Sequence, residues 1–416
     1  MIKITNTFIK SKFLRNSAIY TIGSMMTPVV SLIMLPIFTS YLSPSEYGIM
    51  TTVQALVGMI QLFLSLSIGA AITRFFYDFI DKPDKQREYL GTIYLFTLIF
   101  ATVVSVIMIL LHKVFGNLFF ENIPIKPFYF YLVGLSWVNA LFELPMSLLR
   151  VQEKALQFIG INTLKAFGTM GLTILLIIGF KLKAEGVLIA QISIAFLIVL
   201  ILYVKQARFL SFSLNPTYIK DSLQFCLPLL PHVASGWIIS SSDRIVLEKY
   251  TNLADVGIYA LAAQVSIVLA LFYSSVNNAF VPRFTALKKE GKEIEAKKLL
   301  KLFFVMVVFF GIISIPIAMY GIQLFVSNNY VAAVPIIPYL ILGQIIKGLY
   351  FIPVSKLFYY KRTKSIAMSS SIAAISNIVI NIVAIPYIGI YGAIISTLIS
   401  EILRLILIYK SSRYIT

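Results

Sequence analysis

Long apolar segments follow one another along the whole sequence, and only short polar connections separate them. Most are about twenty residues long or longer, the length that an α-helix needs to cross a hydrocarbon core of roughly 30 Å. So many runs of this length are typical of a bundle of membrane helices. We expect about twelve spans, near residues 16–41, 47–76, 90–111, 128–149, 158–180, 185–205, 222–247, 254–282, 300–325, 332–357, 365–387 and 389–410.

The composition agrees with this pattern. The chain is 59% hydrophobic and 12% charged, with a mean hydropathy of +0.90, whereas roughly a quarter of the residues in soluble domains are charged. Cys226 is its one cysteine, and His112 and His232 are its two histidines. A disulfide framework and a cysteine or histidine metal site are therefore not expected. We predict no metal and no cofactor.

The basic residues predict the orientation of the spans. The net charge is +18, but nucleic-acid binding would need a basic water-soluble domain, and no segment is long enough to form one. Cytoplasmic loops hold an excess of Lys and Arg. One set of alternate connections, with both termini, holds most of these residues, whereas the opposite set holds only Lys113, Lys126, Lys181, Lys183 and Lys249. Both termini are therefore predicted to be cytoplasmic, with an uncleaved first span after residues 1–15.

The sequence contains an internal repeat. It emerges when the segment from Tyr41 is laid without a gap on the segment from Tyr250. Shared apolar bias explains matching Leu and Ile, but it does not explain a coincident acid, glycine and arginine. The matched pairs are Tyr41 and Tyr250, Glu46 and Asp255, Gly48 and Gly257, Ile49 and Ile258, Leu62 and Leu271, Phe63 and Phe272, Ser65 and Ser274, Ala70 and Ala279, Arg74 and Arg283, and Phe75 and Phe284.

The repeat predicts the architecture. Six spans in each copy keep both copies in one orientation, so the halves are related by an axis along the membrane normal. The expected fold is an all-α integral membrane protein of about twelve transmembrane helices, in two parallel-repeat six-helix bundles around a central cavity. The bundles are predicted at residues 1–208 and 209–416. Substrate sites of such folds lie at the repeat interface near the membrane midplane.

Charged side chains inside the spans are candidate functional residues, because a charge facing lipid costs about 2.5 to 3.5 kcal/mol. Lys347 lies near the middle of the tenth span, about 15 Å from either end, too far for easy snorkelling, so we expect it to face the cavity. Lys165, in the fifth span, either faces the cavity or snorkels to the cytoplasmic interface. Arg404 follows Glu401 at the spacing of an ion pair along a helix.

Five further residues are candidates, each with a structural alternative. Glu143, in the fourth span, either couples transport to a proton or cation or is a hydrogen-bonded structural acid. Asp243 and Arg244, near the outer end of the seventh span, form either a solvated rim or a latch across the cavity mouth. The repeat-related Arg74 and Arg283 lie on the cytoplasmic side. They either anchor the topology or attract an anionic substrate, since arginine suits phosphate.

The sequence resembles the O-antigen and capsule flippases of bacterial polysaccharide synthesis, within the multidrug/oligosaccharidyl-lipid/polysaccharide exporter superfamily. The resemblance covers essentially the whole chain. It rests on LPLLPHVASGWIISSSDRIVL at residues 227–247, ADVGIYALAAQVS at 254–266, AFVPRF at 279–284 and NIVINIVAIPYIGIYGAIISTLISE at 377–401.

The resemblance implies a function. It implies alternating-access transfer of an undecaprenyl-diphosphate-linked oligosaccharide from the cytoplasmic to the outer leaflet of the bacterial inner membrane, driven by an ion gradient. Candidate residues for the diphosphate are Lys165, Arg244 and Lys347. The implied partners are the lipid-linked oligosaccharide, membrane lipid, a polysaccharide polymerase and chain-length machinery.

Other classes of function compete with this reading. A multidrug or cation efflux antiporter of the same superfamily would prefer acidic cavity residues, whereas Lys165, Arg244 and Lys347 outnumber Glu143. A membrane polymerase or glycosyltransferase would need a sizeable outer loop, and the outer loops here are short, so we expect no enzyme. A scaffold protein would have no need of charged residues inside its transmembrane helices, and such residues cost free energy in a membrane.

The predicted topology can be tested with reporter fusions. Fusions at Thr416 and at Gly291, which lies in the basic connection at residues 283–301, should behave as cytoplasmic, because lysine-rich loops stay on that side. A fusion at Lys126 should behave as periplasmic. Periplasmic behaviour at Thr416 or Gly291 would contradict the orientation.

Overall fold

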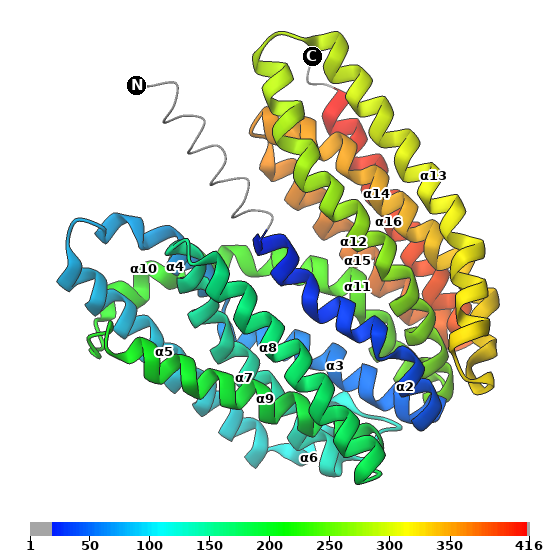
Figure 1. Cartoon of the computed structure of the whole chain (residues 1–416), viewed down its shortest axis with the longest axis horizontal. Helices are drawn as coiled ribbons and strands as arrows, with labels where there is room; N and C mark the ends of the chain where they lie inside the picture. Colours follow the sequence, from blue (N-terminus) through cyan, green and yellow to red (C-terminus); the bar gives the residue numbers. More distant parts are fainter. Residues whose placement is uncertain (1–18, 414–416) are drawn as a thin grey trace. The chain divides into compact units, whose positions relative to one another are not determined.

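The computed structural model describes residues 19–413, and it consists of helices joined by short turns (Figure 1). This range contains no strand, and it holds 12 helices that are long and apolar enough to cross a membrane. The predicted all-α membrane fold with about twelve spans is therefore confirmed. The basic residues before Ile19, on which the predicted side of the N-terminus partly depends, lie outside the described residues.

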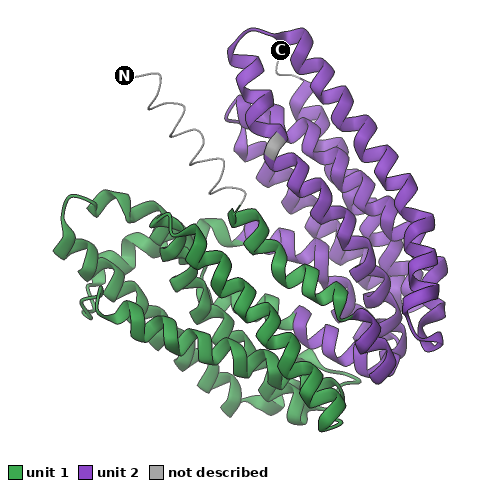
Figure 2. Cartoon of the chain, viewed as in Figure 1, with its two compact units in different colours: residues 1–34, 56–230 green, residues 35–55, 231–416 purple. Residues whose placement is uncertain are grey.

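The chain forms two compact units (Figure 2). One comprises residues 1–34 and 56–230, and the other comprises residues 35–55 and 231–416. We refer to them as unit 1 and unit 2. The boundary predicted from the repeat, between residues 208 and 209, stays a prediction about the two sequence copies. The compact units differ from it in two respects: residues 35–55 pack within unit 2, and residues 209–230 pack within unit 1.

Unit 1 begins with a helix at residues 19–33 and contains most of the first half of the chain. Its other helices are the later part of α3 (Pro44–Ser65), α4 (Gly69–Phe75), η1 (Tyr77–Phe79), α5 (Pro83–Leu110), α6 (His112–Phe119), α7 (Ile125–Val151), α8 (Ala155–Ile174), η2 (Leu175–Gly179), α9 (Lys183–Ala207), α10 (Pro216–Cys226) and η3 (Leu227–Leu229).

Helix α7 is the centre of unit 1. Of its most apolar window, 72% is buried, whereas the corresponding share for the α8 span is 17%. Helices α4, α5, α8 and α9 all pack against α7. A side chain that projects from α7 is therefore surrounded by protein, so polar residues on this helix must find partners on its neighbours.

Unit 2 contains α2 (Leu35–Tyr41), the start of α3 and nearly all of the second half of the chain. Helices α14 and α16 are central, because α12, α13 and α16 pack on α14 and α15 packs on α16. The remaining helices are α11 (Leu230–Tyr250), α12 (Leu253–Lys289), α13 (Glu293–Phe325), η4 (Asn328–Ile336), α14 (Ile337–Tyr359), α15 (Thr363–Ile388) and α16 (Ile390–Arg413).

The second span is interrupted, whereas its repeat partner is continuous. A single helix was expected over residues 47–76, but α3 ends at Ser65 and α4 begins at Gly69. Between them Leu66 and Ser67 have φ values of 48° and 53°, in the left-handed region that breaks a right-handed helix. The corresponding residues of the second copy lie inside α12. The two copies therefore share sequence at this place but not backbone conformation.

The repeat-related acids, Glu46 and Asp255, form hydrogen bonds at the first turns of their helices. The Ser43 backbone N–H donates to the Glu46 carboxylate at 2.9 Å, and the Glu46 backbone N–H donates to the Ser43 hydroxyl at 3.3 Å. Asn252 accepts from the Asp255 backbone N–H at 2.8 Å and donates its amide to the Asp255 carboxylate at 3.0 Å. Both are capping arrangements that satisfy free backbone donors at a helix start. The coincident acid of the repeat is thus a helix cap.

The repeat-related glycines lie against each other, within unit 2. A Cβ on Gly48 would collide with the Leu253 carbonyl oxygen, and one on Gly257 would collide with the Pro44 carbonyl oxygen. The starts of α3 and α12 therefore touch backbone to backbone, an approach that only small residues allow. The Tyr330 hydroxyl donates to the Leu42 carbonyl at 3.0 Å and further holds this segment.

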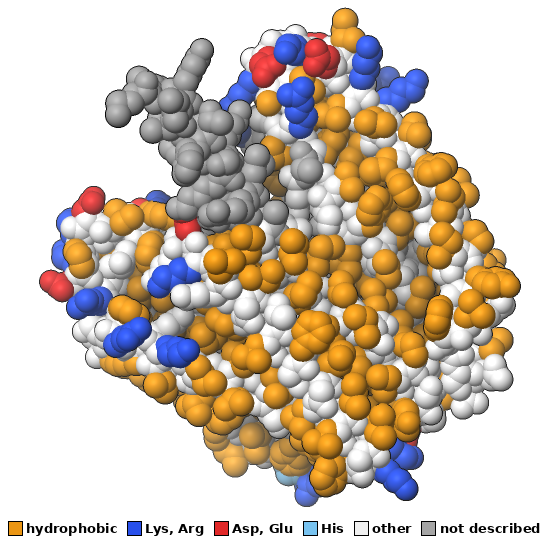
Figure 3. All heavy atoms as spheres, in the orientation of Figure 1, with side chains coloured by type: hydrophobic (Ala, Val, Ile, Leu, Met, Phe, Trp, Pro, Cys, Tyr) orange, Lys and Arg blue, Asp and Glu red, His pale blue; other side chains and the backbone are white. Residues whose placement is uncertain are grey.

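The surface suits a hydrocarbon solvent. Figure 3 shows hydrophobic side chains over the lengths of the helices and Lys, Arg, Asp and Glu gathered near their ends. Many large apolar side chains on α13, including Leu302, Phe309 and Ile317, are more than half exposed. In water such a surface would drive aggregation. The chain is a multi-pass membrane protein.

The glycine contact predicts a sharp sensitivity to one methyl group. Gly257→Ala should lower the stability of the purified protein by about 1–3 kcal/mol, because the new Cβ overpacks a backbone contact. Thermal unfolding in detergent, followed by size-exclusion chromatography, measures this loss. Gly321→Ala on α13 is the matched control, because a Cβ there meets nothing within 4 Å. Equal melting of both variants would refute the contact.

Candidate functional site

Lys165 is held inside unit 1 without an acidic partner. It lies on α8, and its Nζ donates to Asn139 Oδ1 on α7 at 3.1 Å. The same Nζ lies 4.0 Å from the centre of the Phe142 ring, a cation–π distance. No ion pair within residues 19–413 involves this lysine. Its charge therefore remains available to an anion.

Glu143 faces the break between α3 and α4. Ser65, the last residue of α3, is buried, and its side chain lies beside the Glu143 carboxylate. On the other side of the break, a Cβ on Gly69 would come within 2.9 Å of Glu143 Oε1. The carboxylate thus touches both ends of an interrupted span. Discontinuous helices are places where membrane transporters bind ions and substrates.

The repeat-related arginines have different surroundings. Arg74 Nη1 donates to both oxygens of Asp78, at 2.7 and 2.9 Å, and both side chains are exposed. Arg283 is also exposed, but within the described chain it has neither a hydrogen bond nor an ion pair. Because an exposed ion pair is weak, Arg74 can still exchange Asp78 for another anion. The predicted roles of both residues stay predictions.

Asp243 and Arg244 lie inside α11, about two turns before it ends. Asp243 is 5% exposed; one carboxylate oxygen accepts from the Tyr259 hydroxyl on α12, and the other accepts from the Arg244 backbone N–H at 2.8 Å. This burial contradicts the solvated-rim alternative for Asp243. The Arg244 side chain is half-buried, and its Nε has no hydrogen-bond partner among the described residues. A buried guanidinium N–H without a partner is costly, so a ligand oxygen would satisfy it.

A buried polar network lies beside Asp243, and sequence reasoning did not identify it. Ser242 donates to Asn377 Oδ1 at 3.0 Å, and the Asn377 amide donates to Ser396 at 3.0 Å. The Asn381 amide donates to Asn377 Oδ1 at 3.2 Å, while Asn381 Oδ1 has no partner among the described residues. The network joins α11, α15 and α16. Its sequence signal was the i, i+4 spacing of Asn377 and Asn381 in an apolar span.

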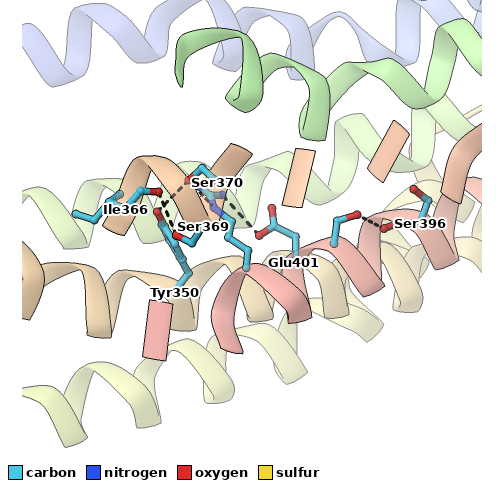
Figure 4. A network of polar contacts seen from close by, with 8 residues as sticks. Tyr350, Ile366, Ser369, Ser370, Ser396 and Glu401 are labelled. Carbon is cyan, nitrogen blue, oxygen red and sulfur yellow. Dashed lines mark hydrogen bonds and ion pairs between the residues drawn. The ribbon is translucent and has the colours of Figure 1, made fainter. Parts of the chain in front are cut away.

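The predicted ion pair on α16 is present, within a second polar cluster (Figure 4). Arg404 Nη1 lies 3.6 Å from Glu401 Oε2, and its Nε donates to the Ser370 hydroxyl at 3.2 Å. The guanidinium carbon lies 3.9 Å from the centre of the Tyr350 ring. Glu401 is 3% exposed. These contacts tie α14, α15 and α16 together, which is a structural role.

Lys347 is in the middle of α14 and is half-buried. Within the described residues it makes no hydrogen bond and no ion pair. The glycine after it in sequence, Gly348, packs so tightly that a Cβ there would meet Tyr273 at 2.7 Å. Lys347 is therefore a charge in the middle of a span without a counter-ion, as expected of a residue kept for a ligand.

The candidate residues belong to both compact units. Lys165, Glu143 and Arg74 lie in unit 1, whereas Asp243, Arg244, Arg283 and Lys347 lie in unit 2. Inside unit 1, Asn139 and Glu143 are one turn apart on α7, so one helix face carries both the partner of Lys165 and the acid at the helix break. Among the described residues no three His, Cys, Asp or Glu side chains are grouped to hold a metal ion.

The buried polar network predicts a loss of stability when its central acceptor, Asn377, is replaced. Asn377→Leu should destabilise the protein by about 1–3 kcal/mol, because Ser242 and Asn381 lose the oxygen to which they donate. Thermal unfolding in detergent measures this. Asn329→Leu is the control, because this residue of η4 is exposed and its side chain makes no hydrogen bond to another described residue. Unchanged melting of Asn377→Leu would show that the network contributes nothing.

Known proteins resemble this chain in sequence. The family of polysaccharide biosynthesis proteins matches residues 13–288. An uncharacterized membrane protein of Haemophilus influenzae is 23% identical over 402 residues, which cover 92% of this chain and 94% of that protein. The capsular polysaccharide biosynthesis protein CapF of Staphylococcus aureus is 28% identical over 111 residues, 27% of this chain and 28% of CapF. The predicted relationship to proteins of polysaccharide synthesis is thereby confirmed.

Solved structures resemble it in fold. The lipid II flippase MurJ, in an inward closed conformation, matches with a TM-score of 0.76 and 16% identity, over 95% of this chain and 87% of MurJ. An inward-facing multidrug resistance MATE transporter of the MOP superfamily matches with a TM-score of 0.71 and 14% identity, over 96% and 97% of the two chains. The chain belongs to the polysaccharide biosynthesis protein family and has the helical fold that MurJ shares with the MATE transporters.

Proposed function

We propose that this protein is a flippase that moves a polyprenyl-diphosphate-linked oligosaccharide, a building block of O-antigen or capsule, from the cytoplasmic to the outer leaflet. The polyprenyl chain stays in lipid while the diphosphate and sugars cross through the protein by alternating access. The implied carrier is undecaprenyl diphosphate. The direction of transfer is the one that the resemblance to the polysaccharide flippases implies, and the lysine-rich connections support the predicted orientation of the chain.

One observation carries the proposal. A match to polysaccharide biosynthesis proteins over residues 13–288 coincides with the fold of MurJ, whose substrate, lipid II, is a lipid-linked sugar. Family and fold here point to one class of cargo. The match of part of the chain to CapF supports a cell-surface glycan as the product.

The cations of the spans suit a diphosphate. Lys165 and Lys347 have no acidic partner among the described residues, and Arg244 Nε has no hydrogen-bond partner. A positive charge in a low-dielectric site attracts phosphate far more strongly than in bulk water. Lysine offers a point charge and arginine a planar fork of donors. We assign the diphosphate to Lys165, Arg244 and Lys347, with Arg74 and Arg283 attracting it from the cytoplasm.

The acids inside the spans suit coupling to an ion. Glu143 contacts Ser65 and Gly69 on the two sides of the helix break, so a change in its charge would act on the geometry of the interrupted span. Asp243 links α11 to α12 through Tyr259. Uptake of a proton or a cation at either carboxylate would change these contacts. We therefore keep both residues as the candidates for coupling or gating.

A second function has support from the MATE structures. A multidrug or cation efflux antiporter has the same fold and would use Glu143 and Asp243 as its substrate-binding acids. The unpaired Lys165 and Lys347 are the observation against it, because they would repel a cationic drug. Partners of a flippase would include a polysaccharide polymerase and its chain-length machinery, acting on the product in the outer leaflet.

Lys347 provides the test of the flippase. Lys347→Ala should abolish surface polysaccharide while leaving the protein folded and inserted, and Lys347→Arg should retain part of the activity, because the charge near the diphosphate is the property that matters. Complementation of a flippase-deficient strain, scored by surface glycan and normalised to membrane protein level, measures this.

Lys356→Ala, in the last turn of the same helix, is the matched control and should leave activity near the wild-type level. A role of Lys347 in packing would reverse the pattern, since Ala would be tolerated and the bulkier Arg would disrupt the helix contact. Full activity of Lys347→Ala at normal expression would contradict the assignment. Resistance to cationic drugs conferred by the wild type would favour the antiporter.

A further inference from the structure

A lateral groove lies within unit 1, between the last turns of α7, the first turns of α8 and the last turns of α9. Its volume is about 710 Å³, within the range of sites that hold small molecules. All of its lining residues belong to residues 148–209, so the groove is complete within one compact unit. None of the candidate transport residues lines it.

The deeper part of the groove is apolar and open to the side. Its walls include Ile161, Leu164, Ile198, Ile201 and Leu202. Leu164 is 60% and Ile201 41% exposed, so these side chains meet the surroundings of unit 1 rather than its core. In a membrane those surroundings are lipid chains, and the walls have the chemistry to hold one.

The end of the groove is basic. Lys154, Lys205 and Arg208 line it, and all three are exposed. Lys154 Nζ and the Arg208 guanidinium carbon lie 5.9 and 4.8 Å from the Phe209 ring centre, so one aromatic ring positions two cations. Within the described chain no acidic side chain forms an ion pair with any of the three.

Amide groups line the same end of the groove as the cations. They belong to Gln152, Gln157 and Gln206. Gln206 is buried and fixed, because its Oε1 accepts from the Tyr94 hydroxyl at 2.6 Å. Its amide NH₂ is therefore a donor in a fixed position. The groove presents a polar end of cations and amide donors, and aliphatic walls continue from it along α8 and α9.

We propose that this groove binds an anionic glycerophospholipid of the cytoplasmic leaflet. The cations match the phosphate, the amide donors beside them match the ester carbonyls next to the phosphate, and the aliphatic walls match an acyl chain. Basic pockets between transmembrane helices on the cytoplasmic side are typical sites for such head groups. The choice of leaflet rests on the predicted topology and does not depend on the transported substrate.

The occupant is a phospholipid rather than the transported molecule. The amides of the groove are hydrogen-bond donors for the ester carbonyls of a glycerophospholipid, which a polyprenyl diphosphate does not have, and the volume of about 710 Å³ has room for a head group and part of a chain. Bound there, the lipid would bridge α7, α8 and α9 and fix the position of α8, the helix that carries Lys165.

Native mass spectrometry of the full-length protein, released from nanodiscs with equal amounts of phosphatidylglycerol and phosphatidylcholine, tests this. The wild type should retain one phosphatidylglycerol. Lys154→Gln/Lys205→Gln/Arg208→Gln should retain it about tenfold less, because three charges near the phosphate are removed. Gly160→Trp should also reduce retention, since Gly160 lines the groove and a Cβ there meets nothing within 4 Å.

The matched control is Lys289→Gln/Lys297→Gln/Lys298→Gln, which removes three exposed cations of unit 2 on the same predicted side. It should retain the lipid as the wild type does. Equal loss in this control, or equal retention of phosphatidylcholine by the wild type, would overturn the proposal. Displacement of the phosphatidylglycerol by equimolar undecaprenyl phosphate would also overturn it, and would make the groove an approach path for the transported lipid.

Discussion

A bilayer supplies no hydrogen-bond partners, so each polar group within it must find one inside the protein. This constraint accounts for the features described here. The starts of α3 and α12 carry caps built from their own side chains. The break between α3 and α4 lies against a buried helix, where Glu143 and Ser65 meet. Polar side chains of α11, α15 and α16 bond to one another. Lys347 has no such partner among the described residues. A ligand is the simplest explanation for a charged group of this kind.

Length and hydropathy predicted the helices well, because crossing a hydrocarbon layer needs an apolar run of fixed minimum length. The spans, their number and the all-α fold followed from the sequence in this way. The interruption after Ser65 could not be predicted from the sequence. The two residues with left-handed backbone are Leu66 and Ser67, and neither of them is a glycine or a proline. The second copy, with the same Ser at position 274, continues as a helix, so tertiary contacts decide the conformation.

The candidate site was predictable as a set of residues and not as a set of contacts. A charged residue inside an apolar span is conspicuous in the sequence, so Lys165, Glu143 and Lys347 could be named as candidates. The partners of these residues could not be named in advance. Lipid and the protein interior are both apolar, so an apolar sequence pattern does not show which face of a helix meets lipid and which face meets protein. Asn139 and Tyr259 became visible as partners only in the structure. The groove of unit 1 could not be predicted either, because its cations and its aliphatic walls come from three helices.

Helix α3 starts in unit 2 and finishes in unit 1, and this has a consequence for biosynthesis. During translation residues 35–55 leave the ribosome long before residues 231–416, which contain Gly257 and Tyr330, the partners of that segment. The early segment must wait in the translocon or the bilayer without its packing surface. Unit 2 therefore cannot assemble from the second half of the gene alone, and splitting the coding sequence between the two repeat copies would yield two fragments that need each other in order to fold.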